Sequence, residues 1–216
     1  GSYPFSIETG YGGPDDLKAF VDAAHDRGIA VFLDVIYNHF GPTDMDMWRY
    51  DGWFENDLGG LYFYNDEDRA YTPWGNTRPD YGREGVRTYI RDNVMQWLHE
   101  FQIDGLRIDG VQWIRRWGDP PWENGGDLPE GWSLLQLMND EVDASQPWKL
   151  IIAEDGANEE WITKSTGEGG AGFDSQYCVD FAHLIRGNLE AVLDEDRDMG
   201  MVASAIGLTY NGWHLQ

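Results

Sequence analysis

The stretch "DGLRIDGVQWI" (residues 104–114) has the composition of a buried strand, but it carries Arg107 and Asp109. Side chains alternate between the two faces of a strand, so Leu106 and Ile108 are predicted on one face and the two charged residues on the other. Burying charge is costly unless the charges are paired or used. The stretch therefore predicts a strand that ends at an ion pair or at a functional site.

Helices and strands are predicted to alternate along the rest of the chain. The strand signals are short β-branched and aromatic runs, and the helix signals are apolar residues on one face between capping signals. Such alternation predicts parallel strands, in a doubly wound sheet or a (β/α)8 barrel. The predicted helices are residues 13–28 and 84–102, one opened by the capping-box pattern of Ser133 and Gln136, and one from about Asn188; the predicted strands are residues 29–39, 104–114, 148–155 and the start of 173–187.

Two segments before residue 83 differ in character. Residues 29–39, "IAVFLDVIYNH", form a nearly continuous apolar run, typical of a strand covered on both faces. Residues 40–82 are rich in aromatic residues, Gly, Pro, Asp and Asn and show no sustained period, which is typical of a functional loop or a small excursion domain. Loop stretches such as "YTPWGN" (71–76) place flat aromatic rings where they suit the apolar faces of sugars, although such rings also pin long loops to a core.

The charge of the chain restricts its partners. Fifteen basic and 39 acidic residues give a net charge of −24, so neither nucleic acid nor an anionic membrane is expected as a partner. A hydrated surface suited to high salt and an acidic docking surface both fit this composition. No apolar run approaches the ~18 residues that span a bilayer, and no signal peptide is visible. With Cys178 as the single cysteine, no internal disulfide forms, and we expect a cytoplasmic protein of unspecified oligomeric state.

Three successive predicted strands end in an acid: Asp34, Asp109 and Glu154. Neighbouring parallel strands lie about 4.8 Å apart, so the last two carboxylates can approach the ~5–5.5 Å separation of retaining glycosidases. This chemistry assigns Asp109 as the nucleophile and Glu154 as the general acid/base. Arg107 alone beside Asp109 also fits a buried ion pair. Clustered acids also bind metals, but five His without a His-x-His pattern make a catalytic transition metal unexpected.

These strand ends resemble a known family. "DVIYNH" (34–39), "GLRID" (105–109) and "IIAED" (151–155) are similar to the first three signature regions of the α-amylase family, glycoside hydrolase family 13, and "RPDY" (78–81) resembles a further short motif of that family. The resemblance covers nearly the whole chain. It implies an α/β fold, a partial (β/α)8 TIM barrel of about strands three to six, with a long excursion after the third strand. The implied divisions are residues 1–39 (start of the catalytic barrel), 40–82 (excursion) and 83–216 (continuation of the barrel).

The resemblance also implies roles for individual residues in an α-retaining reaction on α-glucans such as glycogen, starch or maltooligosaccharides. It matches Asp109 to the nucleophile and Glu154 to the acid/base, and Arg107 to the arginine that orients the nucleophile. Asp34 and His39 match residues that line the site, with His39 touching the sugar. No cofactor is implied for the chemistry, whereas Asn38 and Asp80 match positions that bind a structural calcium in many α-amylases.

The sequence departs from the family pattern in two places. Typical α-amylases carry a Lys-His pair on the acceptor side where this chain has Gln112 and Trp113, so Trp113 is a candidate substrate-binding residue. Together with "GLRIDGV" (105–111), these two residues make the chain resemble glucan branching enzymes and maltooligosyl-trehalose trehalohydrolases more than ordinary endo-amylases. The fourth signature, a strand ending in His-Asp, does not occur, and we expect residues 1–216 alone to be inactive and poorly stable.

Three other readings stay open at this point. The first is α-amylase-type or trehalohydrolase-type hydrolysis instead of branching transfer. The second is a catalytically dead relative that serves as a binding subunit. The third, a nucleotide-binding α/β domain, finds no support in a phosphate-binding loop, since no G-x-G-x-x-G or Walker pattern opens a helix.

Overall fold

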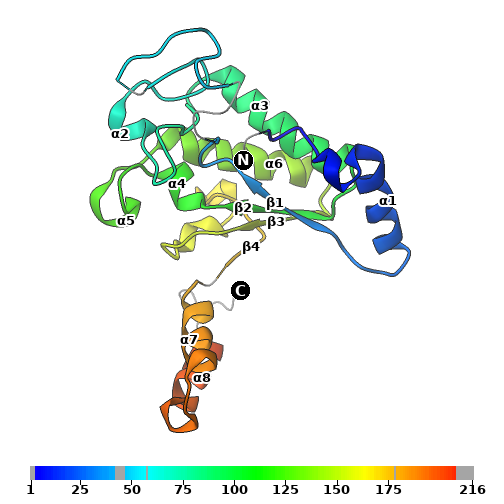
Figure 1. The fold of residues 1–216 in the computed structure, drawn as a ribbon, viewed down its shortest axis with the longest axis vertical. Helices are drawn as coiled ribbons and strands as arrows, with labels where there is room; N and C mark the ends of the chain where they lie inside the picture. The colour runs from blue at the N-terminus through cyan, green and yellow to red at the C-terminus, as the bar shows by residue number, and fades with distance from the viewer. Residues whose placement is uncertain (1–2, 42–46, 57, 178, 208–216) are drawn as a thin grey trace.

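The computed structural model describes residues 3–41, 47–56, 58–177 and 179–207, so the prediction that concerns Cys178 lies outside the described residues. Its centre is a four-stranded parallel sheet in the order β1-β2-β3-β4 (Figure 1). Strands that follow one another in the chain are therefore neighbours in the sheet, as serial βα units require. The strands are β1 (Phe32–Ile36), β2 (Gly105–Asp109), β3 (Leu150–Ala153) and β4 (Ser175–Gln176).

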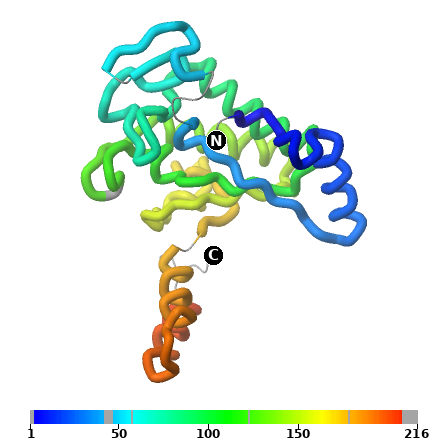
Figure 2. The backbone as a smooth tube through the Cα atoms, viewed as in Figure 1, coloured from blue at the N-terminus to red at the C-terminus, as the bar shows by residue number. Residues whose placement is uncertain are grey.

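Helices α3 and α6 lie together against one face of the sheet, and α7 and α8 form a pair that projects away from the rest (Figures 1 and 2). No helix in the described ranges is long and apolar enough to cross a membrane. The helices are α1 (Gly13–His25), α2 (Glu67–Ala70), α3 (Glu84–Met95), α4 (Val111–Arg115), α5 (Pro121–Asn124), α6 (Pro129–Ser145), α7 (Val179–Glu190) and α8 (Met199–Ile206); η2 (Gln96–Glu100) is a π turn, and η1 (Thr9–Tyr11), η3 (Glu160–Ile162), η4 (Thr166–Glu168) and η5 (Asp194–Asp196) are 3-10 turns.

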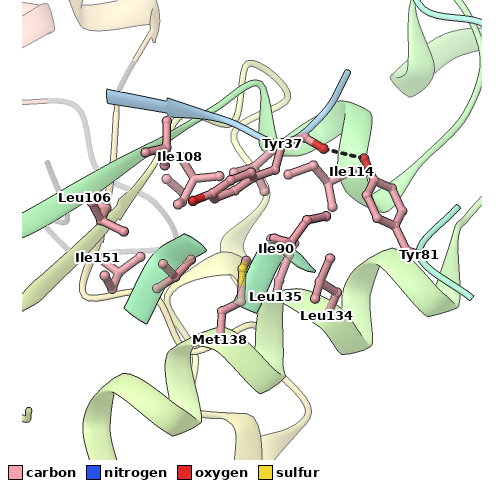
Figure 3. Packing of buried hydrophobic residues seen from close by; sticks show 14 of the residues in the cluster. Tyr37, Tyr81, Ile90, Leu106, Ile108, Ile114, Leu134, Leu135, Met138 and Ile151 are labelled. Atoms are coloured by element: carbon pink, nitrogen blue, oxygen red, sulfur yellow. Dashed lines mark hydrogen bonds between the residues drawn. The ribbon is translucent and has the colours of Figure 1, made fainter. Parts of the chain in front are cut away.

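The core lies between the sheet and the two helices α3 and α6. Leu106 and Ile108 of β2 are fully buried and pack with Ile90 of α3 and Met138 of α6 (Figure 3). Burial of each such side chain stabilises the fold by roughly 1.5–3 kcal/mol. The predicted alternation along residues 104–114 is therefore confirmed. The apolar face predicted for residues 84–102 is confirmed as well, because all its members are buried: Val86, Ile90, Val94, Trp97, Leu98 and Phe101.

The prediction that residues 29–39 form a strand covered on both faces is wrong for the described structure. Strand β1 lies at the edge of the sheet and pairs with β2 alone among the described strands. Phe32 is 42% exposed. Leu33 and Ile36 line an apolar cavity of about 530 Å³ together with Phe20 of α1, itself 60% exposed. An apolar run indicates that a strand is suited to burial, but it does not specify which face of the strand is buried.

The predicted start of the third helix is also wrong. Helix α6 begins at Pro129, because a proline at the first helical position has its φ already fixed for a helix. Ser133 and Gln136 therefore lie inside the helix and form no capping box. The Ser133 hydroxyl donates to the Glu130 carbonyl (3.1 Å), and the Gln136 amide donates to the Gly170 carbonyl (2.8 Å).

The final helix does not begin at Asn188. Asn188 lies near the end of α7, where its amide donates to the Leu184 carbonyl (3.1 Å) and its side-chain oxygen accepts from the Asp198 backbone N–H (2.7 Å). Asp198 in turn caps α8, accepting from the N–H groups of Gly200 and Met201. The segment is thus two helices with Asn188 fixing the turn between them, a long-range contact that helical periodicity does not report.

The described part of residues 40–82 contains little regular structure apart from α2. Arg78 is fully buried, and its guanidinium donates to the carbonyls of Arg116 (2.8 Å) and Tyr71 (2.6 Å). The Thr77 hydroxyl donates to the Phe40 carbonyl (2.6 Å) and joins the two ends of the segment. Several of its aromatic residues therefore pack into the core instead of facing solvent: Phe40, Phe63, Tyr64 and Tyr81. The boundaries 1–39, 40–82 and 83–216 stay a prediction.

Candidate active site

The register of the sheet brings the predicted charged residues to one place. Asp34 of β1 pairs with Arg107 of β2, and Ile108 pairs with Ala153 of β3. The Glu154 N–H donates to the Ile108 carbonyl (2.9 Å), which extends the β2–β3 ladder beyond Ala153. Because side chains alternate along each strand, the four charged residues of these strand ends emerge on the face opposite the helical core, at the carboxyl end of the sheet.

Arg107 binds all three predicted carboxylates. Its Nη1 lies 2.7 and 2.8 Å from the two oxygens of Asp34 and 2.8 Å from Asp109 Oδ1, while its Nη2 lies 2.8 Å from Glu154 Oε1. Burial alone lowers the pKa of Arg107, but its carboxylate partners raise it overall. The ion pair that residues 104–114 suggested therefore exists. It is part of a cluster in which one cation faces three acids, which leaves excess negative charge at the site.

Asp109 and Glu154 each have a second donor. The Asn38 amide donates to Asp109 Oδ2 (2.9 Å), and the Gly110 N–H donates to Glu154 Oε2 (2.9 Å). Gly110 has φ 54°, and a Cβ there would lie 2.6 Å from Asn38 Nδ2, so the position requires glycine. Both oxygens of each carboxyl group are thus held in place by a donor. Their side chains remain 25% and 30% exposed, which leaves them accessible to a ligand.

The neighbouring acid Asp155 has a different environment. It is fully buried, and its carboxylate receives two hydrogen bonds from Arg115, from Nε at 2.7 Å and from Nη2 at 3.1 Å. The Ala157 N–H donates a third, at 2.9 Å. Of the two acids in "IIAED", the first therefore faces the open site and the second is an internal ion pair.

His39 lies next to this cluster as a neutral imidazole. Its Nδ1 is 2.5 Å from Asn38 Oδ1, and its ring stacks on Trp74 with a centroid separation of 4.6 Å and an interplanar angle of 15°. Burial lowers the pKa of His39 to about 4. At neutral pH the ring therefore offers one N–H donor and no positive charge.

We expect a nuclear magnetic resonance titration of the His39 ring to give a midpoint near pH 4, because burial lowers its pKa to about 4. The unfolded chain takes up this proton near pH 6.5, so it binds more protons than the folded chain between these values. The free energy of unfolding should then fall as pH falls from about 6.5 towards 4. His39→Gln identifies the resonance and should flatten this dependence; a midpoint at the ordinary value would contradict the prediction.

Substrate binding by Trp113 stays a prediction, but the structure places this side chain below the surface of the site. Trp113 is 5% exposed and packs edge-on against Trp74 at 5.8 Å, with Arg78 5.9 Å from its ring. Trp74 is 46% exposed and offers its ring to the open side instead. Trp113 thus supports the aromatic platform without forming its surface. Gln112, the other departure from the family pattern, accepts from the Gly156 N–H (3.2 Å) and braces the loop after Glu154.

Two aromatic residues of the site were missed from the sequence. Trp74 belongs to the loop stretch 71–76, whose composition suggested sugar contacts without placing any of them. Tyr177 follows β4, is 50% exposed, and lies with its ring centroid 5.3 Å from the Arg107 guanidinium. Its position directly after a strand is the signal that could have identified it.

Asn38 and Asp80, the two residues predicted to bind calcium, have protein partners in the described structure. The Asn38 side chain is buried, with its amide donating to Asp109 and its oxygen engaged by His39. Asp80 accepts from Arg83 (2.8 Å) and from the Gly82 N–H (3.1 Å). No group of three or more His, Cys, Asp or Glu in the described ranges is arranged to hold a metal ion. Calcium takes six to eight oxygen ligands, of which these two residues are candidates for two, and calcium binding stays a prediction.

Comparisons with known proteins identify the class to which this parallel sheet, with acids at the carboxyl ends of its strands, belongs. Residues 3–57 match the sequence profile of the α-amylase catalytic domain. The α-amylase of Geobacillus thermoleovorans in complex with acarbose superposes with a TM-score of 0.66 at 19% identity, over 99% of this chain and 44% of that one. The maltogenic α-amylase AmyB of Thermotoga neapolitana gives 0.63 at 19% identity, over 94% and 40%. These two likenesses show the fold, and they confirm the predicted partial barrel.

The chain belongs to the α-amylase family. It is 34% identical to the 1,4-α-glucan branching enzyme GlgB of Hydrogenovibrio crunogenus over 182 residues, which are 80% of this chain and 24% of that protein. It is 35% identical to GlgB of Thiobacillus denitrificans over 176 residues, 77% of this chain and 23% of that one. The chain thus spans about a quarter of the length of the curated relatives it matches.

Proposed function

We propose that the protein carrying this chain is a retaining α-glucan-active enzyme of carbohydrate metabolism that performs 1,4-α-glucan branching. One observation carries the proposal: Arg107 holds Asp109 and Glu154 side by side at the ends of neighbouring strands, with both carboxylates accessible. Two accessible carboxylates at adjacent strand ends are the arrangement that retaining glycosidases use. The relatives named as branching enzymes favour transfer.

The geometry supports a two-step reaction. Asp109 attacks the anomeric carbon of an α-1,4-linked glucosyl unit, while Glu154 gives its proton to the departing glycosidic oxygen. Glu154 then removes the proton from the 6-hydroxyl of an acceptor glucan, whose oxygen displaces Asp109 and forms an α-1,6 linkage. Arg107 and Asn38 hold Asp109 in position for the attack. Neutral His39 and the exposed face of Trp74 border the sugar that is cleaved.

The proposal is tested by the products formed from linear α-1,4-glucan. Branching transfer should produce α-1,6 linkages with little new reducing sugar, as measured by linkage analysis and a reducing-end assay. Hydrolysis should release maltooligosaccharides, one new reducing end for each bond broken. A ratio near one reducing end per cleaved bond would overturn branching in favour of α-amylase-type or trehalohydrolase-type hydrolysis, in which water replaces the acceptor sugar.

A catalytically dead binding subunit is disfavoured, because Asp109 and Glu154 are both present and oriented. The proposal requires no cofactor for the chemistry and takes an α-glucan as the partner. A cytoplasmic location, the absence of nucleic-acid and membrane partners, and a structural calcium site remain predictions from the sequence.

A further inference from the structure

A separate cavity of about 410 Å³ lies outside the carboxylate cluster, between the first turns of α6 and the loop after β3. The rings of Trp132 and Trp161 line it, and Leu128 and Arg115 contribute to its wall. Its volume is within the ~300–1,000 Å³ range of small-ligand sites. No step of the proposed reaction uses this tryptophan cavity.

The walls of the tryptophan cavity are fixed by hydrogen bonds. Trp132 Nε1 donates to the Gly169 carbonyl (3.2 Å), and the Gln136 amide donates to the next carbonyl, of Gly170 (2.8 Å). On the other side, the Trp161 backbone N–H donates to Glu159 Oε1 (3.3 Å), and the Lys164 ammonium lies 5.2 Å from the Trp161 ring centroid. Trp161 is nevertheless 39% exposed. The cavity is therefore preformed, with an accessible aromatic ring.

The charges around the cavity indicate the kind of ligand. At its rim, Asp127 is 83% exposed with Arg116 Nε at 3.4 Å, and Glu159 is 34% exposed with Arg115 Nη1 at 3.9 Å. The cation among the lining residues, Arg115, is 8% exposed and already paired with Asp155. These charges are partnered within the protein, so none of them is left to select a charged ligand. Tryptophan rings beside carboxylate and amide groups fit a neutral polyhydroxylated ring, whose C–H face packs on the aromatic ring and whose hydroxyls donate to the oxygens.

We propose that the tryptophan cavity binds a segment of α-glucan chain outside the cluster of catalytic carboxylates; the identity of the sugar rests on the proposed function. The cavity shares its loop with the active site, because Glu154 is followed directly by Asp155, whose partner Arg115 lines the cavity.

The experiment measures maltoheptaose binding by isothermal titration calorimetry to the protein that carries this chain. An Asp109→Asn background prevents turnover during the titration. At least two binding sites are expected in this background, the carboxylate cluster and the tryptophan cavity. Adding Trp161→Ala should remove one of them or weaken it by about tenfold, as for a central aromatic anchor. Trp148→Ala is the matched control, since Trp148 is 70% exposed and lies outside the cavity, and it should change neither site.

Two further variants define the ligand. Trp161→Phe keeps an aromatic ring, needs less rearrangement than Trp161→Ala, and should weaken the second site by only about threefold. Asp127→Asn keeps an acceptor oxygen but removes a charge, so binding of a neutral sugar should stay within about twofold. Tetramethylammonium is the competing probe, because tryptophan and carboxylates also bind cations. The glucan assignment would be overturned if tetramethylammonium binding is lost in Asp127→Asn while maltoheptaose binding is unchanged by Trp161→Ala.

The outcomes separate this inference from the proposed function. Identical maltoheptaose titrations for Trp161→Ala and Trp148→Ala, with normal turnover in the unmodified protein, overturn the inference and leave the function standing. Absence of glucan turnover in the unmodified protein, together with maltoheptaose binding that depends on Trp161, overturns the function and supports the cavity as a glucan site.

Discussion

Asp109→Asn is expected to lower the turnover of α-glucan by about three orders of magnitude or more in the protein that carries this chain, because the nucleophile is lost. The substitution is nearly isosteric: the amide oxygen can still accept from Arg107 as Asp109 Oδ1 does now, and only the hydrogen bond from the Asn38 amide to Oδ2 is lost, at a side chain that is 25% exposed. Folding should therefore be preserved. Glu154→Gln removes the proton donor and should cost about 10²–10⁴-fold.

The measurement is the initial rate on linear α-1,4-glucan, normalised to folded protein by circular dichroism. Azide offers an internal check on the roles, because a small external anion can replace a missing carboxylate. Azide should restore activity to variants in which a smaller side chain replaces Asp109 or Glu154 and leaves room for the anion. The anomer of the glycosyl azide that forms then reports which of the two residues was replaced. Turnover within a factor of about ten of the unmodified protein for both variants would support a non-catalytic role.

Asp155→Ala is expected to lower the free energy of unfolding by about 3–5 kcal/mol, the typical cost of removing one partner of a buried ion pair. The substitution leaves Arg115, 8% exposed, without its bidentate carboxylate. The remaining acid near it, Glu159, lies 3.9 Å away and cannot replace two short hydrogen bonds. Urea denaturation followed by tryptophan fluorescence measures the loss.

The exposed pair Arg186–Glu190 is the matched control for this prediction. Its side chains are 72% and 62% exposed, so Glu190→Ala should change stability by less than about 1 kcal/mol. The contrast between Asp155 and Glu154, the acid that precedes it in the sequence, is equally informative. Glu154→Gln should remove activity with little loss of stability, whereas Asp155→Ala should first remove stability. Equal urea midpoints for Asp155→Ala and Glu190→Ala would contradict the structural role of the buried pair.

The parts of the site that follow a local period were predictable from the sequence. Alternation along β2 separates Leu106 and Ile108 from Arg107 and Asp109, and the structure places them accordingly. The same rule distinguishes the two acids of "IIAED". Ile151 and Ala153 are buried on one face, and Asp155 continues that face, whereas Glu154 lies on the other.

The parts that depend on contacts between distant segments were not predictable. His39 and Trp74 stack although they are far apart in sequence, and no pattern in either segment specifies the pairing. The sequence pointed to Trp113 as a ring of the site, whereas Trp74 is the exposed ring. The cause is the same, since the burial of Trp113 depends on how residues 40–82 fold over α4. At the start of α6, two local signals competed, and Pro129 prevailed over the Ser133 pattern.

The pairing of Asp34 with Arg107 across β1 and β2 has a consequence for how the protein matures. Because side chains point alternately to opposite faces, sliding either strand by a single residue would turn its acid into the apolar interior and bring an aliphatic side chain to the mouth of the site. A molecule with such a slip loses the whole charge cluster at once. During refolding each molecule should therefore be either fully active or inactive, and the active fraction should equal the fraction of chains with the correct strand register.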